Sequence, residues 1–186
     1  GHGVPGAMMS VICGNALSSA VKEFDLSSPE QILHKANAII QETLRTTAND
    51  VRDGMDIALC VWDKSTNKLH FSGAFNSFYC CRDGEFIILR ADRIPVGRYI
   101  RSDQTFTLHE MTLQKGDTFY LFTDGYADQF GGEKGKKLKI NALKALLLRI
   151  CEKPLATQKA VLGQHFDEWR GDLEQGDDVC VLGGRV

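Results

Sequence analysis

Two acidic stretches in this 186-residue chain combine residue types that could do chemistry. Asp124 and Gly125 follow the apolar run "FYLF", and Asp177 and Asp178 come directly before the apolar run "VCVL". If the two runs pair as antiparallel strands, the end of one lies beside the start of the other. Their carboxylates would then converge at one sheet edge, where a hard divalent cation offsets their repulsion and desolvation cost. Oxygen ligands without histidine favour Mg²⁺ or Mn²⁺ over zinc.

Each acidic stretch also has a simpler interpretation when it is taken alone. Asp124 could cap a turn, and Asp177 and Asp178 could form a solvated loop, because aspartate is common in turns. Gly125 allows the backbone to turn sharply and a ligand to approach closely. Spacing alone leaves the metal interpretation and the turn interpretation both open.

The elements that must position these residues are indicated by the hydrophobic pattern. Residues 5–21 are apolar on nearly every face, which predicts a buried helix. Periodic apolar residues predict further helices over 28–44, 141–151 and 155–169. Alternating or continuous apolar runs predict strands over 56–63, 68–75, 77–91, 104–111, 117–122 and 179–182. The Asp83-Gly84 pair is the strongest hairpin signal. Helices, then strands, then helices and a last strand predict an α+β fold in a single domain.

Composition narrows the classes of partner. The net charge is -2, from 22 basic and 24 acidic residues. The composition therefore lacks the excess of positive charge that is typical of nucleic-acid-binding domains. We find no apolar run near the ~20 residues that span a membrane and no secretory signal, so we expect a cytoplasmic domain without membrane contact. The six cysteines include no Cys-x-x-Cys pair, and the five histidines lack zinc spacing. We expect reduced, structural cysteines.

Several stretches carry a family resemblance in the right order along the whole chain. They read "GHGVPGAMMS", "DGMDIAL", "FSGAFNSFY", "RIPVG", "LQKGDTFYLFTDGYADQFGGEKGKKL" and "GDDVCVLGGRV". Together they resemble the SpoIIE-type phosphatases, the bacterial branch of the metal-dependent serine/threonine protein phosphatases (the PPM superfamily). The block around "TDG" is the most specific of them.

The resemblance implies a four-layer α-β-β-α sandwich, with antiparallel sheets flanked by helices, and a two-metal centre of Mn²⁺ or Mg²⁺ at one end. Asp124 and Asp177 match metal ligands, so they are the implied catalytic residues. The metals would activate a water for attack on phosphoserine or phosphothreonine. Gly125 and Asp178 would support the loop or a water.

The sequence departs from the family pattern at two places. The first family ligand is an aspartate that would precede Gly1, and the opening strands are missing with it. We therefore expect residues 1–186 to be a catalytic domain that is incomplete at its N-terminus, binds metal poorly alone and forms a homodimer over the gap. The turn at Asn76 differs from the usual Asn-Asn-Pro, so substrate contacts there are open.

Two further residues are weaker site candidates. His2, in the Gly-His-Gly turn, could act as an acid, although loop packing explains it more simply. Asp56 could approach an additional metal, but the start of a strand explains it as well.

The resemblance also implies a biological setting. The substrate would be a phosphorylated regulatory protein, such as a STAS-type anti-sigma-factor antagonist. The domain would therefore take part in signalling that regulates sigma factors. A sensor domain would precede this domain in the full-length protein. The alternative is a catalytically inactive phosphatase-fold module that binds a partner. The retention of both Asp124 and Asp177 favours catalysis.

Overall fold

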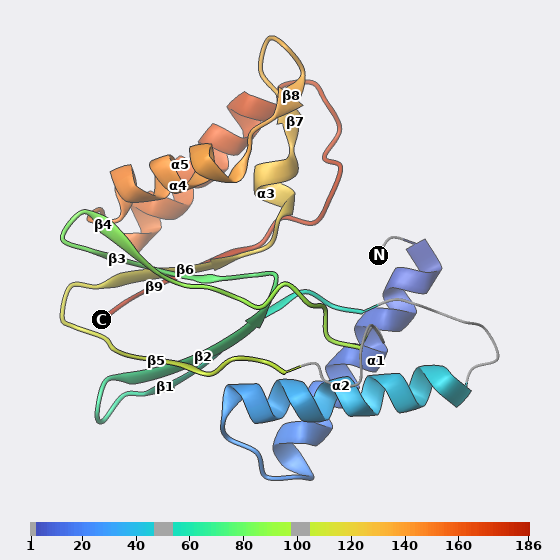
Figure 1. Cartoon of the computed structure of the whole chain (residues 1–186). Coiled ribbons are helices and arrows are strands. Elements are labelled where there is room, and N and C mark those ends of the chain that lie inside the picture. The colour runs from blue at the N-terminus through green and yellow to red at the C-terminus, as the bar shows by residue number, and fades with distance from the viewer. Residues whose placement is uncertain (1–2, 47–53, 98–104) are drawn as a thin grey trace. The chain divides into compact units, whose positions relative to one another are not determined.

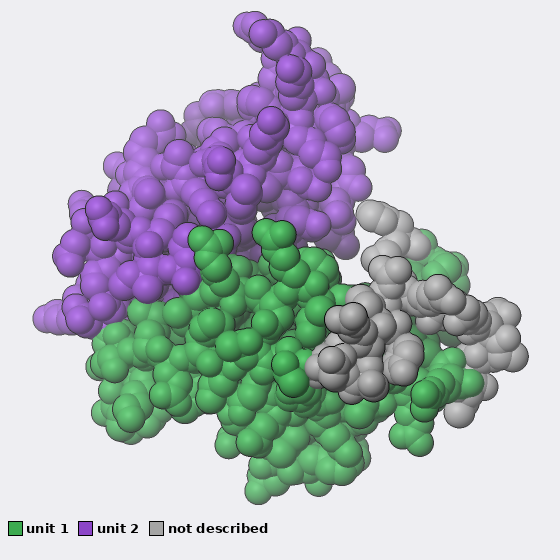
Figure 2. Space-filling model, in the orientation of Figure 1, with its two compact units in different colours: residues 1–77, 89–113 green, residues 78–88, 114–186 purple. Residues whose placement is uncertain are grey.

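The computed structural model describes residues 3–46, 54–97 and 105–186, and the chain falls into two compact units (Figure 2). Unit 1 comprises residues 1–77 and 89–113, and unit 2 comprises residues 78–88 and 114–186. Each unit holds an antiparallel sheet and helices that pack on it. The expected α+β class is therefore confirmed.

Unit 1 is built on a three-stranded sheet in the order β1-β2-β5. The strands are β1 (Ile57–Asp63), β2 (Lys68–Ala74) and β5 (His109–Thr112), and both pairings are antiparallel. Helix α2 (Pro29–Thr46) contacts β1 and β2, and α1 (Gly3–Lys22) packs on α2 (Figure 1). The unit's core is shared by the two helices, β2 and the segments before β5. Its buried members are Met9, Cys13, Ala16, Leu33, Ala36, Ile40, Ala74, Val96 and Phe106.

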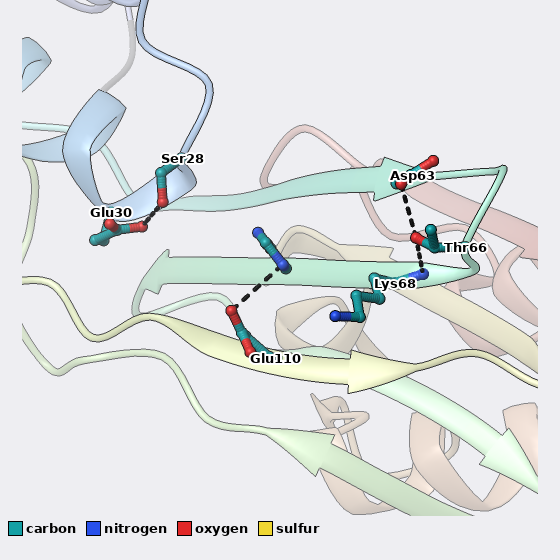
Figure 3. A network of polar contacts seen from close by, with 7 residues as sticks. Ser28, Glu30, Asp63, Thr66, Lys68 and Glu110 are labelled. Atoms are coloured by element: carbon teal, nitrogen blue, oxygen red, sulfur yellow. Dashed lines mark hydrogen bonds and ion pairs between the residues drawn. The ribbon is translucent and has the colours of Figure 1, made fainter.

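Polar contacts fix the turn and the register of this sheet, and Figure 3 shows several of them. In the turn after β1, the hydroxyl of Thr66 donates to the Asp63 carboxylate over 2.7 Å. The backbone N–H of Lys68 donates back to the Thr66 hydroxyl at 3.4 Å. Across β2 and β5, His70 faces Glu110, with 3.4 Å between Nε2 and Oε1. The turn predicted at residues 65–67 is confirmed.

The first helix is longer than predicted, and only one of its faces is buried. Gly6, Met9, Cys13, Ala16 and Ala20 are its buried residues. The apolar side chains on the opposite face are exposed, namely Val4 at 74%, Met8 at 60% and Val11 at 63%. The prediction that this helix is buried all round was therefore wrong. The apolar composition of the helix does not show how many of its faces are covered by other elements.

The same helix corrects the statement that no apolar run could span a membrane. Over an 18-residue window of α1 the mean hydropathy is 1.4, and 28% of that window is buried. By length and composition α1 could therefore cross a bilayer. A core helix or a signal sequence near the N-terminus can meet the same criteria, so they alone do not assign α1 to a membrane.

Unit 2 contains a four-stranded sheet in the order β4-β3-β6-β9. Its strands are β3 (Phe78–Arg82), β4 (Glu85–Leu89), β6 (Thr118–Phe122) and β9 (Val181–Arg185). The turn between β3 and β4 consists of two residues with positive φ, 51° and 77°, as the Asp83-Gly84 signal predicts. The last strand begins two residues later than expected, at Val181.

Two long helices cover one face of this sheet (Figure 1). They are α4 (Ile140–Ile150) and α5 (Leu155–Arg170), close to the predicted ranges. Between β6 and α4 lie the short helix α3 (Gly125–Asp128) and the two-residue strands β7 (Phe130–Gly131) and β8 (Lys136–Lys137). The hydrophobic core of unit 2 includes residues of both the sheet and these helices. Its largest buried members are Tyr120, Tyr126, Leu143, Leu147 and Ile150.

One buried ion pair joins β3 to the start of β6. Arg82 Nε and Nη2 donate to the two carboxylate oxygens of Asp117 over 2.8 Å and 2.6 Å. The Asp117 side chain is 2% exposed, and it also accepts the N–H of Gln114 at 2.8 Å. Burial acts to raise the pKa of Asp117, but the hydrogen bonds from Arg82 and Gln114 outweigh it and hold that pKa below its ordinary value.

The cysteines differ from the expectation of reduced, structural thiols. Cys81 on β3 and Cys151 after α4 form a disulfide, although 70 residues separate them in sequence. Cys180 is exposed, although it lies in an apolar run. The pairing is a tertiary contact between a strand and a helix end, and neither position carries a local signal of it.

Candidate metal centre

The strands β6 and β9 bring the two acidic stretches together. They pair antiparallel, with Phe122 opposite Val181 as the last pair of the ladder at this end. Beyond that pair, Thr123 N–H donates to the Cys180 carbonyl at 3.0 Å. The Thr123 hydroxyl donates to the Asp178 carbonyl at 3.0 Å and accepts the Cys180 N–H at 3.0 Å. The chain after β6 is thus joined to the chain before β9, as the antiparallel pairing predicts.

Gly125 is a point of close approach between these segments. It is the buried first residue of α3. A Cβ atom there would lie well under 3.0 Å from the carbonyl oxygen of Asp178 and 3.4 Å from Cβ of Asp177. Side-chain carbons are essentially never found so close to a backbone oxygen. The glycine therefore allows the backbone carrying Asp177 to pass directly beside the loop carrying Asp124.

Asp124 does not act as a side-chain cap. It occupies the N-cap position of α3 with helical φ and ψ of -71° and -20°, and within the described residues its carboxylate makes no capping hydrogen bond. Its backbone carbonyl accepts the N–H of Asp128 at 2.9 Å. The side chain is exposed. The structure therefore does not support the interpretation of Asp124 as a turn cap.

Asp177 is held by its neighbours in the loop before β9. Its Oδ1 accepts the backbone N–H of Asp178 at 2.7 Å, and its carbonyl accepts Gln175 Nε2 at 2.8 Å. Asp177 is half-buried, whereas Asp178 is exposed. The Asp178 backbone carbonyl accepts the Thr123 hydroxyl, and the supporting role predicted for Asp178 stays a prediction.

The donor set fits a hard divalent cation only in part. Asp124, Asp177 and Asp178 offer carboxylate oxygens, the ligand type of Mg²⁺ and Mn²⁺. Among residues 3–46, 54–97 and 105–186, however, no group of three or more His, Cys, Asp or Glu side chains is placed to hold a metal ion. Within the described part of the chain, these carboxylates therefore do not form a complete metal site.

The remaining predicted site residues belong to the other unit or fall outside the described residues. Asp56 is an exposed residue before β1, and Asn76 follows β2, where its N–H donates to the Ala74 carbonyl at 2.7 Å. Both belong to unit 1, whereas Asp124, Gly125, Asp177 and Asp178 belong to unit 2. His2 lies outside the described residues.

Sequence reasoning did not predict the structural roles of Thr123 and Gln175. Thr123 connects the two acidic segments through both its backbone and its hydroxyl, and Gln175 holds the carbonyl of Asp177. A hydroxyl residue between a strand end and an aspartate is a weak signal, because threonine is common in strands. Its partners lie 55 and 57 residues away and appear only in the fold.

Comparisons with known proteins identify the family of this chain. The family model "Stage II sporulation protein E (SpoIIE)" matches residues 1–186. Among solved structures, the SiaA-PP2C domain of Pseudomonas aeruginosa is 32% identical, with a TM-score of 0.87, over 100% of this chain and 72% of that one. Among curated proteins, none matches this chain significantly.

Two more distant structures share the fold. The PP2C phosphatase domain of SpoIIE from Bacillus subtilis, solved with a fragment of its regulatory domain, is 16% identical, with a TM-score of 0.71, over 100% of this chain and 52% of that one. RsbX in complex with magnesium is 14% identical, with a TM-score of 0.62, over 100% of this chain and 76% of that one.

The whole-length family match and the 32% identity together show that this chain belongs to the SpoIIE family of PP2C-type phosphatase domains.

Proposed function

We propose that this domain catalyses metal-dependent hydrolysis of phosphoserine or phosphothreonine on a bacterial regulatory protein. The observation that carries the proposal is the close passage of the Asp177–Asp178 segment beside Gly125. It sets two acidic segments, far apart in sequence, side by side at one sheet end. Carboxylates held near one another repel, and a divalent cation offsets that repulsion.

Each residue has a distinct role in this proposal. Asp124 and Asp177 are the ligands of a two-metal centre of Mn²⁺ or Mg²⁺ and are therefore the catalytic residues. When bound, the metals would supply a nucleophilic water at neutral pH and neutralise the phosphate. Thr123 and Gly125 position the two ligands, since one joins the segments and the other lets them approach. Magnesium in the related RsbX structure supports the choice of cation.

The proposed setting is a signalling pathway. The B. subtilis SpoIIE structure includes part of a regulatory domain, which supports a sensor domain ahead of this one. We propose a phosphorylated STAS-type anti-sigma antagonist as substrate and a cytoplasmic location. We also propose that the domain needs chain upstream of Gly1 for its first metal ligand, and that without it the chain forms a homodimer. Sedimentation of this chain and of an extended one would measure the mass of each.

A catalytically inactive binding module is the second candidate. The observation that favours it is the lack, among the described residues, of three acidic, histidine or cysteine side chains that could hold an ion together. The two candidates differ in one measurable property. An enzyme gains a complete metal centre when the domain is extended upstream, whereas a binding module does not.

The test is phosphate release from a phosphoserine peptide by the domain extended upstream of Gly1, with added Mn²⁺. We expect Asp124→Ala and Asp177→Ala to abolish turnover, because the nucleophilic water depends on the ions that they hold. Asp172→Asn is the matched control, since it removes an exposed charge from the same loop region. Full activity in either alanine variant, or turnover undiminished by a chelator, would contradict the proposal.

A further inference from the structure

The disulfide between Cys81 and Cys151 lies in a part of unit 2 that the proposed catalysis does not use. Its two Cα atoms are 6.5 Å apart, within the range that disulfides span. Both residues are buried, at 4% and 2% exposure. Burial of this kind usually makes cysteine chemically inert. A route for reagents is therefore needed before any redox chemistry can be assigned.

A small hollow provides that route. Its volume is 190 Å³, and both cysteines line it, together with Arg82, Lys115 and Glu152. This volume is several times the share of one water molecule in the liquid, about 30 Å³. The thiol end of a small molecule can therefore enter. The charges along its wall are mixed, because Asp83, Asp117 and Glu152 line it beside Lys115 and Arg82, and Arg82 is paired with Asp117.

The site accommodates the reduced state as well as the disulfide. The carbonyl oxygen of Leu148 lies 3.2 Å from Sγ of Cys151, so in the reduced form this thiol has an acceptor for its S–H. The carbonyl belongs to the last turns of α4. Reduction therefore leaves the Cys151 thiol with a hydrogen-bond partner.

Cys151 also connects several elements of the unit. Its backbone carbonyl accepts the Thr118 hydroxyl at 3.0 Å, Gln158 Nε2 at 3.0 Å and Arg185 Nη2. These donors come from β6, α5 and β9. The disulfide thus links β3 to the residue whose backbone carbonyl accepts hydrogen bonds from β6, α5 and β9.

We propose that Cys81 and Cys151 form a reversible redox site that exchanges with small-molecule disulfides such as glutathione disulfide. One protein thiolate attacks a sulfur of the small disulfide, forming a mixed disulfide and releasing one small thiolate. The second protein thiolate then attacks the protein sulfur of that mixed disulfide and releases the other. The two protons lost by the protein thiols end on the two released thiols, and a dithiol reverses the reaction. In a reducing compartment, disulfides of this kind are usually transient and redox-sensing.

The chain contains a matched control thiol. Cys80 is the sequence neighbour of Cys81, but its side chain is buried in the core, and burial raises its pKa to about 12. It therefore stays protonated at neutral pH and does not attack a disulfide. Cys180 is exposed and controls for simple accessibility.

The experiment equilibrates the full chain in buffers of graded glutathione to glutathione disulfide ratio. Free thiols are then trapped with N-ethylmaleimide, and digested peptides are mapped by mass. We expect a peptide pair linking Cys81 to Cys151 that appears with oxidation and vanishes with dithiothreitol. Oxidation should raise the midpoint of thermal unfolding by roughly 10 °C, because the link closes a long loop in the unfolded chain.

Variants separate this proposal from general oxidation. Cys81→Ser and Cys151→Ser should each lose the oxidation-dependent rise, whereas Cys180→Ser should keep it. The wild-type peptide map needs no variant, so it decides the question even if a serine variant fails to fold. Absence of the linked peptide at every ratio, or a thermal rise that persists in Cys151→Ser, would overturn the proposal.

Discussion

Replacing Gly125 by alanine tests the packing that sets the two acidic segments side by side. The new Cβ would meet the Asp178 carbonyl oxygen well under 3.0 Å and the carbonyl carbon at 3.0 Å. Both are backbone atoms, so no side chain can rotate away. The segment that carries Asp177 must instead move back by roughly 1 Å to restore ordinary contact.

That displacement has two consequences of known size. Overpacking of this kind typically costs about 1–3 kcal/mol of unfolding free energy, and the Thr123 hydrogen bond to the Asp178 carbonyl, now 3.0 Å, would lengthen with it. Magnesium holds its ligands at about 2.0–2.1 Å and tolerates little distortion. A carboxylate moved by roughly 1 Å leaves the coordination sphere, and misplacement of that order can reduce turnover about 100-fold.

Two assays measure these effects separately. Thermal unfolding of the chain should show a midpoint lowered by roughly 2–4 °C for each kcal/mol lost. Manganese titration and phosphopeptide turnover, made on the domain extended upstream of Gly1, should show weaker binding and about 100-fold slower turnover. The matched control is Gly176→Ala, one residue before Asp177, because a Cβ there meets nothing within 4 Å.

The reasoning would be refuted if Gly125→Ala bound manganese and turned over substrate as well as Gly176→Ala does. That result would mean that the Asp177 segment needs no close approach to Gly125. Equal loss in both variants would also contradict it, since the control adds a methyl group to open space.

Two further predictions concern the stability of unit 2. Asp117→Asn should lower the unfolding free energy by about 3 kcal/mol. This is the low end for a broken buried ion pair, because the Arg82 side chain is 21% exposed. Urea unfolding measures the change, and a loss under about 1 kcal/mol would contradict the prediction. Burial, then the charge of Arg149, lowers the pKa of His165 below 6.5, so the folded state favours the neutral ring. The neutral His165 ring therefore stabilises the folded state above about pH 6.5, and this stabilisation is lost as pH falls below that value. His165→Gln should flatten the slope of unfolding free energy with pH in this window, and an unchanged slope would show that another group causes it.

Much of the fold follows from local sequence signals. The Asp83-Gly84 pair predicts a two-residue turn because both positions need positive φ, and the structure has that turn. The apolar spacing of α4 predicts its buried face, which includes Leu143 and Leu147. The pairing of β6 with β9 was predicted from the acidic residues at their ends and is confirmed. Such features depend on neighbours in sequence or on one strand pairing.

Other features depend on distant contacts and could not be predicted from the sequence. The exposed face of α1, with Met8 and Val11, has the composition of a buried helix, and only packing distinguishes the two. The Cys81–Cys151 link depends on where α4 ends relative to β3. Thr123 finds its partners across the chain. The predicted roles of Asp124 and Asp177 as metal ligands remain predictions.

The most direct test of the central claim counts bound metal ions. Manganese binding is measured by calorimetry on the domain extended upstream of Gly1, and on the same domain carrying Asp124→Ala or Asp177→Ala. We expect two ions per extended chain, fewer in either variant, and weak binding by residues 1–186 alone. Two tightly bound ions in both alanine variants would contradict the claim that these carboxylates hold the metals. Tight binding of two ions by a monomer of residues 1–186 would contradict the need for the upstream ligand.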